Sequence, residues 1–288
     1  DAADLRVEVG DVRGRQALRV IYPSDRVVYD DGGWGGNTEL SVHEDGTWGG
    51  SDGWRDRRDR VRVSSRGSGM EAHADMTIGV PRGQRVDIYL AVGRITAENV
   101  DGRVILDTHS GAVEARGMSG FLRVDTGSGS ATVAGMRGDL EVDTGSGSVR
   151  VSDVQGEEIS IDTGSGGVEA AGLVSGRLVI DTGSGGIDVM RSSARDVTFD
   201  TGSGSVEAEL TGEVDDMVID TGSGSVTLRL PADLHATVDI ETGSGGIDVD
   251  FPLSVTRRGR DVLRGQIGNG GGRIVVETGS GSVRLRRI

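Results

Sequence analysis

The sequence predicts an all-β protein folded as a parallel β-solenoid, or β-helix, of roughly 18–21-residue coils, with a less regular β-rich region at its N-terminus. Two observations lead to this prediction. The segment Asp-Thr-Gly-Ser-Gly-Ser at 143–148 recurs in nine close copies at short intervals. Apolar residues alternate with polar ones on both sides of every copy. A motif that repeats at a short, nearly fixed period is the signature of a repeat architecture.

The nine copies follow one another at steps of 18, 18, 19, 19, 19, 20, 21 and 36 residues. The last step is about two ordinary steps, so one coil lacks the motif. That coil carries the glycine-rich stretch 265–272, which we expect to form a loop that bulges from the column. The copies begin at Asp107, Asp125, Asp143, Asp162, Asp181, Asp200, Asp220, Glu241 and Glu277.

Four positions around each acid are apolar in all nine copies: three residues and one residue before it, and six and eight residues after it. In the third copy they are Leu140, Val142, Val149 and Val151. This period of two indicates two short strands per coil, joined by the Gly-Ser turn. Because one strand pair cannot bury its apolar face alone, the coils must stack about 4.8 Å apart in parallel. A flattened two-sheet coil and a triangle with a short third side both fit, with either handedness.

The chain is predicted to divide into an irregular, β-rich N-terminal cap at 1–80 and the solenoid repeats at 81–288. Alternating runs at 5–9 and 18–22 are expected to form strands with one buried face. A glycine-rich segment of this region contains Trp34, Trp48 and Trp54. These side chains fit two roles. They could plug the open end of the solenoid, or they could stack on sugar rings or anchor a neighbouring subunit.

Composition excludes several classes of protein. Glycine accounts for 50 of the 288 residues, cysteine is absent, and all 31 basic residues are arginine, so disulfides and lysine cross-links are excluded. A net charge of −15 and a pI near 4.7 argue against nucleic acid or an anionic membrane as partners. No run approaches the ~20 apolar residues of a membrane span. The start at Asp1 suggests a processed, exported chain.

Asp-Thr-Gly-Ser is also the active-site motif of aspartic proteases. Those enzymes need two such loops that meet so that two carboxylates share a proton. Here stacking would instead line up nine loops in a single file, so a protease is not expected. The four histidines are scattered without ligand spacing, and no other catalytic pattern stands out. We therefore expect no enzymatic activity.

Stacking would place the nine acids outward, as a ladder of like charges. Neighbours about 4.8 Å apart repel by roughly 1 kcal/mol in water. Two arrangements would offset this repulsion: an Asx-type hydrogen bond from the Gly-Ser turn to each carboxylate, or a file of Ca²⁺ ions between coils. Glu241 and Glu277 keep the charge but not the Asx geometry, which favours a need for charge. No other cofactor is expected.

Three stretches carry a resemblance to a known family. They are residues 76–83 (Met-Thr-Ile-Gly-Val-Pro-Arg-Gly), the repeated Asp-Thr-Gly-Ser-Gly turns, and Gly265–Gly272 leading into the copy at Glu277. From about Met70 to Ile288 the chain resembles a bacterial adhesin-like family, a widespread domain of unknown function. The resemblance implies a parallel β-helix exported to the cell surface or beyond. It supplies no catalytic residues, and the segment Gly32–Trp54 departs from it.

The leading functional hypothesis is a secreted or cell-surface, non-enzymatic structural solenoid that associates with itself end to end into a fibre or surface layer. The last clean coil ends at 283–288, which is expected to leave an open parallel edge. Its Arg284, Arg286 and Arg287 could meet an acidic N-terminal face of another copy, or could blunt the edge. The alternative is a surface solenoid that binds or, less readily, cleaves polysaccharide. Ice or mineral binding by the Thr, Ser and Asp ladders ranks third.

Overall fold

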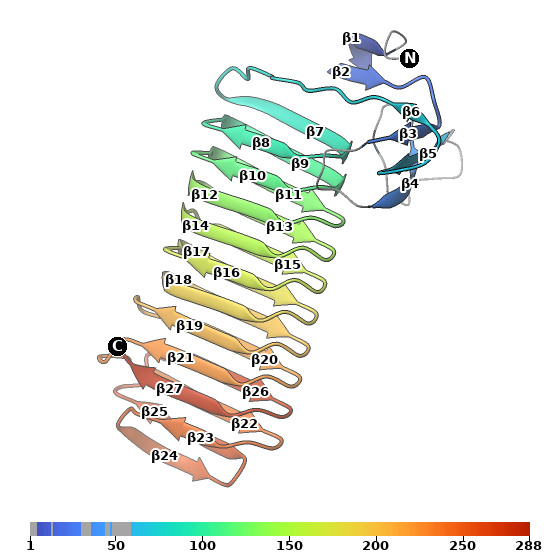
Figure 1. The fold of residues 1–288 in the computed structure, drawn as a ribbon. Helices are drawn as coiled ribbons and strands as arrows, with labels where there is room; N and C mark the ends of the chain where they lie inside the picture. The colour runs from blue at the N-terminus through green and yellow to red at the C-terminus, as the bar shows by residue number, and fades with distance from the viewer. Residues whose placement is uncertain (1–4, 13, 30–35, 44–46, 48–58) are drawn as a thin grey trace. The chain divides into compact units, whose positions relative to one another are not determined.

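The computed structural model describes residues 5–12, 14–29, 36–43, 47 and 59–288. Contacts within the chain divide it into two units. The N-terminal unit comprises Asp1–Gly79 with Ala91–Gly93, and the solenoid unit comprises Val80–Leu90 with Arg94–Ile288. All regular elements in the described residues are β-strands (Figure 1). None of these residues belongs to a helix with the length and apolar character needed to cross a membrane.

The N-terminal unit contains two small sheets. Strands β1 (Arg6–Val12) and β2 (Arg15–Ile21) form an antiparallel pair. A four-stranded sheet has the order β4-β5-β3-β6, from β3 (Arg26–Val28), β4 (Asn37–Val42), β5 (Asp59–Ser64) and β6 (Met70–Glu71). The strands expected at 5–9 and 18–22 exist, but their expected buried face does not, because Val7 and Val9 are 66% and 75% exposed. A two-stranded ribbon has no second layer of its own to cover that face.

The solenoid unit winds its strands into two rows, one on each side of the Gly-Ser corner (Figure 1). One strand, β18 (Ile187–Thr201), runs through the second corner of its coil and belongs to both rows. The first row, before the Gly-Ser corner, contains β7 (Gln84–Val92), β9 (Asp101–Ser110), β11 (Ser119–Thr126), β13 (Leu140–Thr144), β15 (Glu158–Thr163), β17 (Val174–Thr182), β20 (Asp216–Thr221), β22 (Ala236–Thr242) and β26 (Gly272–Thr278). The second row, after the corner, contains β8 (Ile95–Glu98), β10 (Val113–Arg116), β12 (Ala131–Arg137), β14 (Val149–Gln155), β16 (Val168–Ala171), β19 (Val206–Leu210), β21 (Val226–Leu230), β23 (Ile247–Val249) and β27 (Val283–Arg287).

Each repeat strand pairs in parallel with its counterparts in the adjacent coils, and equivalent motif positions face one another. Val142, for example, lies between Val124 and Ile161. The four predicted apolar positions are buried in every coil except that of β23, where Ile247 and Val249 are only partly buried. The predicted parallel β-solenoid is therefore confirmed. Its stability comes from a continuous aliphatic column, since each coil covers the apolar edge of the next.

The second corner of the coil also has a repeated conformation. A residue with left-handed backbone recurs at the same place in successive coils, and the next residue re-enters the core or its edge. In the described solenoid these left-handed residues are Asn99, Gly117, Gly135, Asp153, Gly172 and Arg191, with φ between 47° and 67°. Buried Met118, Met136, Val154 and Leu173 follow directly. A short coil-to-coil pairing then precedes the next first-row strand, as between Gln155 and Val174. The coil thus has a short third side.

The order of the coils departs from the order of the sequence at the C-terminal end. Strand β26 lies between β20 and β22, so Asp220 faces Glu277, and Glu277 faces Glu241. Likewise β27 lies between β21 and β23. The expectation that 283–288 forms an open terminal edge is therefore wrong. The last coil fills a level inside the column, because it is flanked by two coils that precede it in the chain.

The stretch that lacks the motif does not form a bulging loop. It folds into an antiparallel hairpin of β24 (Leu253–Arg258) and β25 (Val262–Ile267), and β25 also pairs antiparallel with β22. The first row therefore ends in β22-β25-β24. Phe251, Leu263 and Ile267 of this region are buried and belong to the same core cluster as the coils. The glycines that follow the hairpin carry the chain back into the column.

Candidate functional site: an acidic ladder and the corner beneath it

The nine acids predicted as a ladder stand in direct register along the first row. Their side chains face outward, because each strand alternates and the residues on both sides of the acid are buried. Asp107 and Asp125 are half-buried and the other seven acids are exposed. From one end to the other, the ladder runs Asp107, Asp125, Asp143, Asp162, Asp181, Asp200, Asp220, Glu277 and Glu241.

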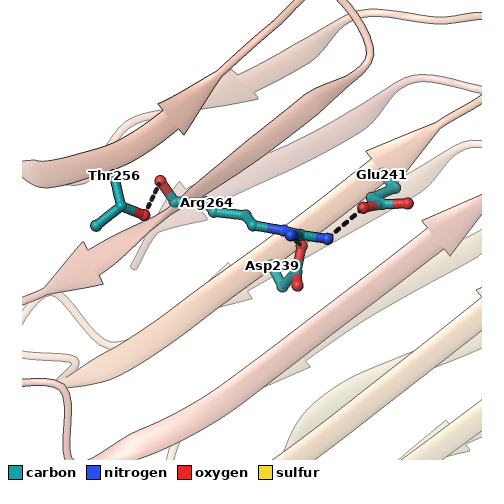
Figure 2. A network of polar contacts seen from close by, with 4 residues as sticks. All are labelled: Asp239, Glu241, Thr256 and Arg264. Carbon is teal, nitrogen blue, oxygen red and sulfur yellow. Dashed lines mark hydrogen bonds and ion pairs between the residues drawn. The ribbon is translucent and has the colours of Figure 1, made fainter.

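Arginine neutralises the ladder near both ends. Near the N-terminal end, Arg123 Nη2 lies 3.5 Å from Asp125 Oδ2. At the far end Arg264, on β25, contacts two acids of the adjacent strand β22. Its Nε lies 2.8 Å from Asp239 Oδ1 and its Nη2 lies 2.6 Å from Glu241 Oε1 (Figure 2). The Thr256 hydroxyl on β24 donates to the Arg264 carbonyl oxygen at 3.1 Å. The hairpin therefore does more than end the sheet, since it supplies the positive charge that terminates the ladder.

Burial and charge repulsion along the ladder raise the pKa of three of its acids. Burial and the carboxylates of Asp143 and Asp181 raise the pKa of Asp162 above its ordinary value of 3.8. Burial and Asp200 raise the pKa of Asp181. Burial and Asp143 also raise the pKa of Asp125, outweighing the opposite effect of Arg123. Raised pKa values mean that these ionised carboxylates destabilise the fold.

We predict that mild acid stabilises the solenoid. A carboxyl group whose folded pKa is raised contributes stability that is present when it is protonated and lost as pH rises through that pKa. The free energy of unfolding should therefore increase as pH falls from 7 toward 3.8, the ordinary carboxyl value. His109 acts in the opposite direction below 6.5, because burial lowers its pKa. Denaturant titrations across this range measure the balance.

Asp162→Asn isolates the part due to the ladder. This change removes repulsion with two neighbours, each worth roughly 1 kcal/mol before screening by salt. We expect a gain in stability on the order of 1 kcal/mol at pH 7 and low salt. The gain should shrink as pH falls and as salt is added. A variant that is no more stable than the parent at pH 7 would contradict the repulsive ladder.

The threonine that follows the acid binds adjacent coils together in eight of the nine copies, whereas the Thr108 hydroxyl of the first copy has no hydrogen-bond partner among the described residues. All nine of these threonines are buried, at most 4% exposed. The Thr182 hydroxyl donates to the carbonyl oxygen of Gly166 in the preceding coil at 2.9 Å and accepts from the backbone N–H of Gly185 in its own corner at 2.9 Å. The hydroxyl makes the same donation from Thr126, Thr144, Thr163, Thr201, Thr221, Thr242 and Thr278. We call this arrangement the threonine clasp.

The clasp replaces the Asx-type bond that the sequence suggested. The amide of the glycine four residues after the acid donates to the threonine hydroxyl, as in Gly204 to Thr201. The amide of the glycine two residues after the acid donates to a threonine carbonyl in the adjacent coil, as in Gly202 to Thr182. These corner amides are therefore already engaged, and the acids face away from them. The acids can then vary between Asp and Glu without loss of corner geometry.

Three ladder acids, Asp220, Glu277 and Glu241, line an open pocket of about 540 Å³ beneath the hairpin, together with Arg257 and Asp261. Elsewhere the acids stand in file and do not converge in pairs. Within the part of the chain that the structure describes, no three acidic or histidine side chains are grouped so that they could hold a metal ion. The Ca²⁺ file, one of the two arrangements considered from the sequence, therefore has no geometric support in these residues.

The other predicted site residues do not join the ladder. Trp34, Trp48 and Trp54 lie outside the described residues. Strand β27, which carries Arg284, Arg286 and Arg287, lies between β21 and β23 and not at the end of the column. Arg286 forms ion pairs with Asp248 at 2.6 Å and Asp250 at 3.1 Å, both in the adjacent coil. These bonds lower the pKa of Asp248.

Sequence reasoning missed two contributors to this site. The threonine clasp had a signal, because a threonine follows every acid and strand alternation turns it inward when the acid faces outward. Arg264 had no such signal, because it lies in the stretch without the motif and its partners become neighbours only through the antiparallel pairing of β25 with β22.

Comparison with known proteins identifies the family. The family described as Toastrack DUF4097 matches residues 55–286, which cover most of the chain and nearly the whole solenoid unit. No significant match is found among curated proteins or among solved structures. The stacked coils, the outward acids and the threonine clasp are thus features of a Toastrack domain, and the chain belongs to the Toastrack DUF4097 family.

Proposed function

We propose that this protein is a non-enzymatic structural solenoid, displayed outside the cell, that serves as a rigid scaffold and associates end to end with further copies. The observation that carries the proposal is the uniform stacking of the coils. The core is a continuous aliphatic column, and the nine acids stand in outward file without pairing across a cleft. Such a file offers a long, regular surface but no matched acid and base.

The absence of catalysis is tested at the pocket beneath the hairpin, which is lined by three ladder acids together with Arg257. Purified protein should turn over neither peptide nor polysaccharide substrates. Turnover that is lost in Asp220→Asn or Glu277→Gln, but kept in Asp162→Asn at the middle of the ladder, would overturn the proposal. That result would assign the activity to the pocket.

The contact proposed for end-to-end association is strand β24. Among the described residues, β24 pairs with β25 alone, so its other edge is free to pair. Its Val255 is 46% exposed, and exposed Arg257 and Arg258 follow. A free edge favours pairing with another chain, and arginine at the edge selects an acidic partner. Because the chain has a net charge of −15, a second copy of it is such an acidic partner.

Light scattering and electron microscopy test this association. We expect assemblies larger than the 29.9 kDa monomer at low salt, which shrink as salt screens the arginines. Arg257→Glu with Arg258→Glu should abolish them. Arg137→Glu, an exposed change on β12, in a coil far from β24, should leave them intact. Monodisperse monomers at every protein and salt concentration would remove the association from the proposal.

Two further expectations accompany the proposal. Display outside the cell would be measured by protease digestion of intact cells, with a cytoplasmic protein as control. The alternative function, glycan binding, depends on tryptophans that lie outside the described residues. Glycan-array binding that is lost in Trp34→Ala or Trp48→Ala would favour it over the scaffold.

A further inference from the structure

The last coil of the solenoid occupies a level that the preceding chain has skipped. Strand β21 ends at Leu230 and β22 begins at Ala236, yet these neighbours in sequence are separated in the column by β26 and β27. Without residues 272–287, β20 and β21 would face β22 and β23 across a gap one coil thick. We call this level the slot.

The slot is filled as completely as any other level. Ile274, Val276, Val283 and Leu285 of the filling segment are all fully buried. The threonine clasp also runs through it without interruption, because Thr278 donates to the Gly224 carbonyl at 2.9 Å and Thr242 donates to the Gly281 carbonyl at 2.8 Å. Because burial of such aliphatic side chains stabilises a fold, an empty slot would be unfavourable.

The filling segment is connected to the rest of the chain through the short glycine-rich stretch 268–272, which we call the glycine hinge. Gly268 and Gly270 have left-handed backbone, with φ of 59° and 73°. A side chain at Gly272 would overlap the backbone carbonyl of Val214. His235 fastens the hinge, since its Nδ1 accepts from the Asn269 amide at 3.1 Å and its carbonyl accepts from the Gly272 amide at 2.8 Å. The conformation of this hinge directs the segment either into the slot of its own chain or away from it.

We propose that the segment Gly272–Arg287 is an exchangeable element, and that the slot accepts it from a second copy of this chain. An exchanged segment makes every contact that the intrachain one makes, because both copies present the same slot. The two states therefore differ mainly in the hinge and in concentration, which is the condition for domain swapping. Reciprocal exchange gives a dimer joined through the interior of both columns, distinct from contact through β24.

The absence of cysteine allows a direct test. Val218 faces Val275 across the boundary between β20 and the segment, and both side chains are half-buried on the outer surface. Adjacent parallel strands lie about 4.8 Å apart, within the Cα separation that a disulfide bridges. We would make Val218→Cys with Val275→Cys in the full chain. The matched control is Val179→Cys with Thr198→Cys, which joins β17 to β18 far from the hinge.

Each variant would be unfolded, refolded at low and at high protein concentration, oxidised, and separated on a denaturing gel without reductant. The control pair should give cross-linked monomers at both concentrations. The pair across the slot should give disulfide-linked dimers whose fraction rises at least several-fold with concentration. Contact through β24 alone would leave no covalent dimer, so the two modes of association are distinguished.

Shortening the hinge gives a second measurement. Deletion of Gly270 and Gly271 in the same cysteine pair should prevent the segment from returning to its own slot, and should make the linked dimer the main product even in dilute refolding. Circular dichroism would verify that the variant regains its β-structure. Cross-linked monomers alone, in both the parent pair and the shortened hinge, would overturn the proposal.

Discussion

Gly147→Ala is expected to destabilise the solenoid by about 3 kcal/mol or more, because a methyl group there would overlap backbone of the adjacent coil. A Cβ atom at Gly147 would overlap the carbonyl group of Gly129 and crowd the amide of Ser130. Backbone cannot move aside as a flexible side chain can. The change should lower the midpoint of urea denaturation and open the column locally, since each coil contacts only its neighbours.

The control is Gly246→Ala, in the corner that follows Glu241 and one residue further from its acid than Gly147 is from Asp143. No atom lies within 4 Å of a Cβ built at Gly246, and its backbone is not left-handed. We expect an effect within about 0.5 kcal/mol of the parent protein. If both alanine variants were equally stable, close approach of adjacent corners would not be the reason for the glycine at position 147.

Thr182→Val is expected to cost about 3 kcal/mol. The substitution keeps the shape of the side chain but removes the hydroxyl. The buried Gly166 carbonyl loses its donor and the Gly185 amide loses its acceptor, and each buried group without its partner costs roughly 1–3 kcal/mol. Because Thr182 is fully buried, water cannot replace either bond.

Two other variants separate the loss of the hydroxyl from the loss of packing at Thr182. Thr182→Ser keeps the hydroxyl and should cost only about 1 kcal/mol, the value of one buried methyl group. Thr198→Val changes an exposed threonine on β18, the strand that pairs with β17, and should have little effect. Equal losses for Thr182→Val and Thr182→Ser, measured by denaturant unfolding, would show that the clasp contributes nothing beyond packing.

The fold class was predictable because the sequence repeats two simple constraints. Alternation around each Gly-Ser turn defines one apolar face per strand, and a face that narrow can be covered only by another coil. The nine acids could be placed on the outer surface for the same reason, since their neighbours on both sides are buried. The hydrogen bonds of the threonines and the stacking order of the last coils could not be predicted in this way.

The threonines illustrate a choice between two polar residues side by side. Sequence reasoning offered an Asx-type corner hydrogen bond to the acid as one of two arrangements, because aspartate commonly caps such turns. Alternation gives the inward position to threonine instead, and only a hydroxyl can both donate to a carbonyl and accept from an amide there. A carboxylate in that buried position would lack the donor and would carry a desolvated charge.

By itself the sequence determined the two strands on either side of the Gly-Ser turn, the repeat length and the outward file of acids, because these depend on local alternation and on glycine at the corner. Only the tertiary structure decided which coil lies next to which at the C-terminal end. The coils share one motif, so several stacking orders satisfy the same register and bury the same kinds of side chain. Contacts absent from the repeat select among them: the β24–β25 hairpin, Arg264 across the sheet, and the glycine hinge that returns the chain to the slot.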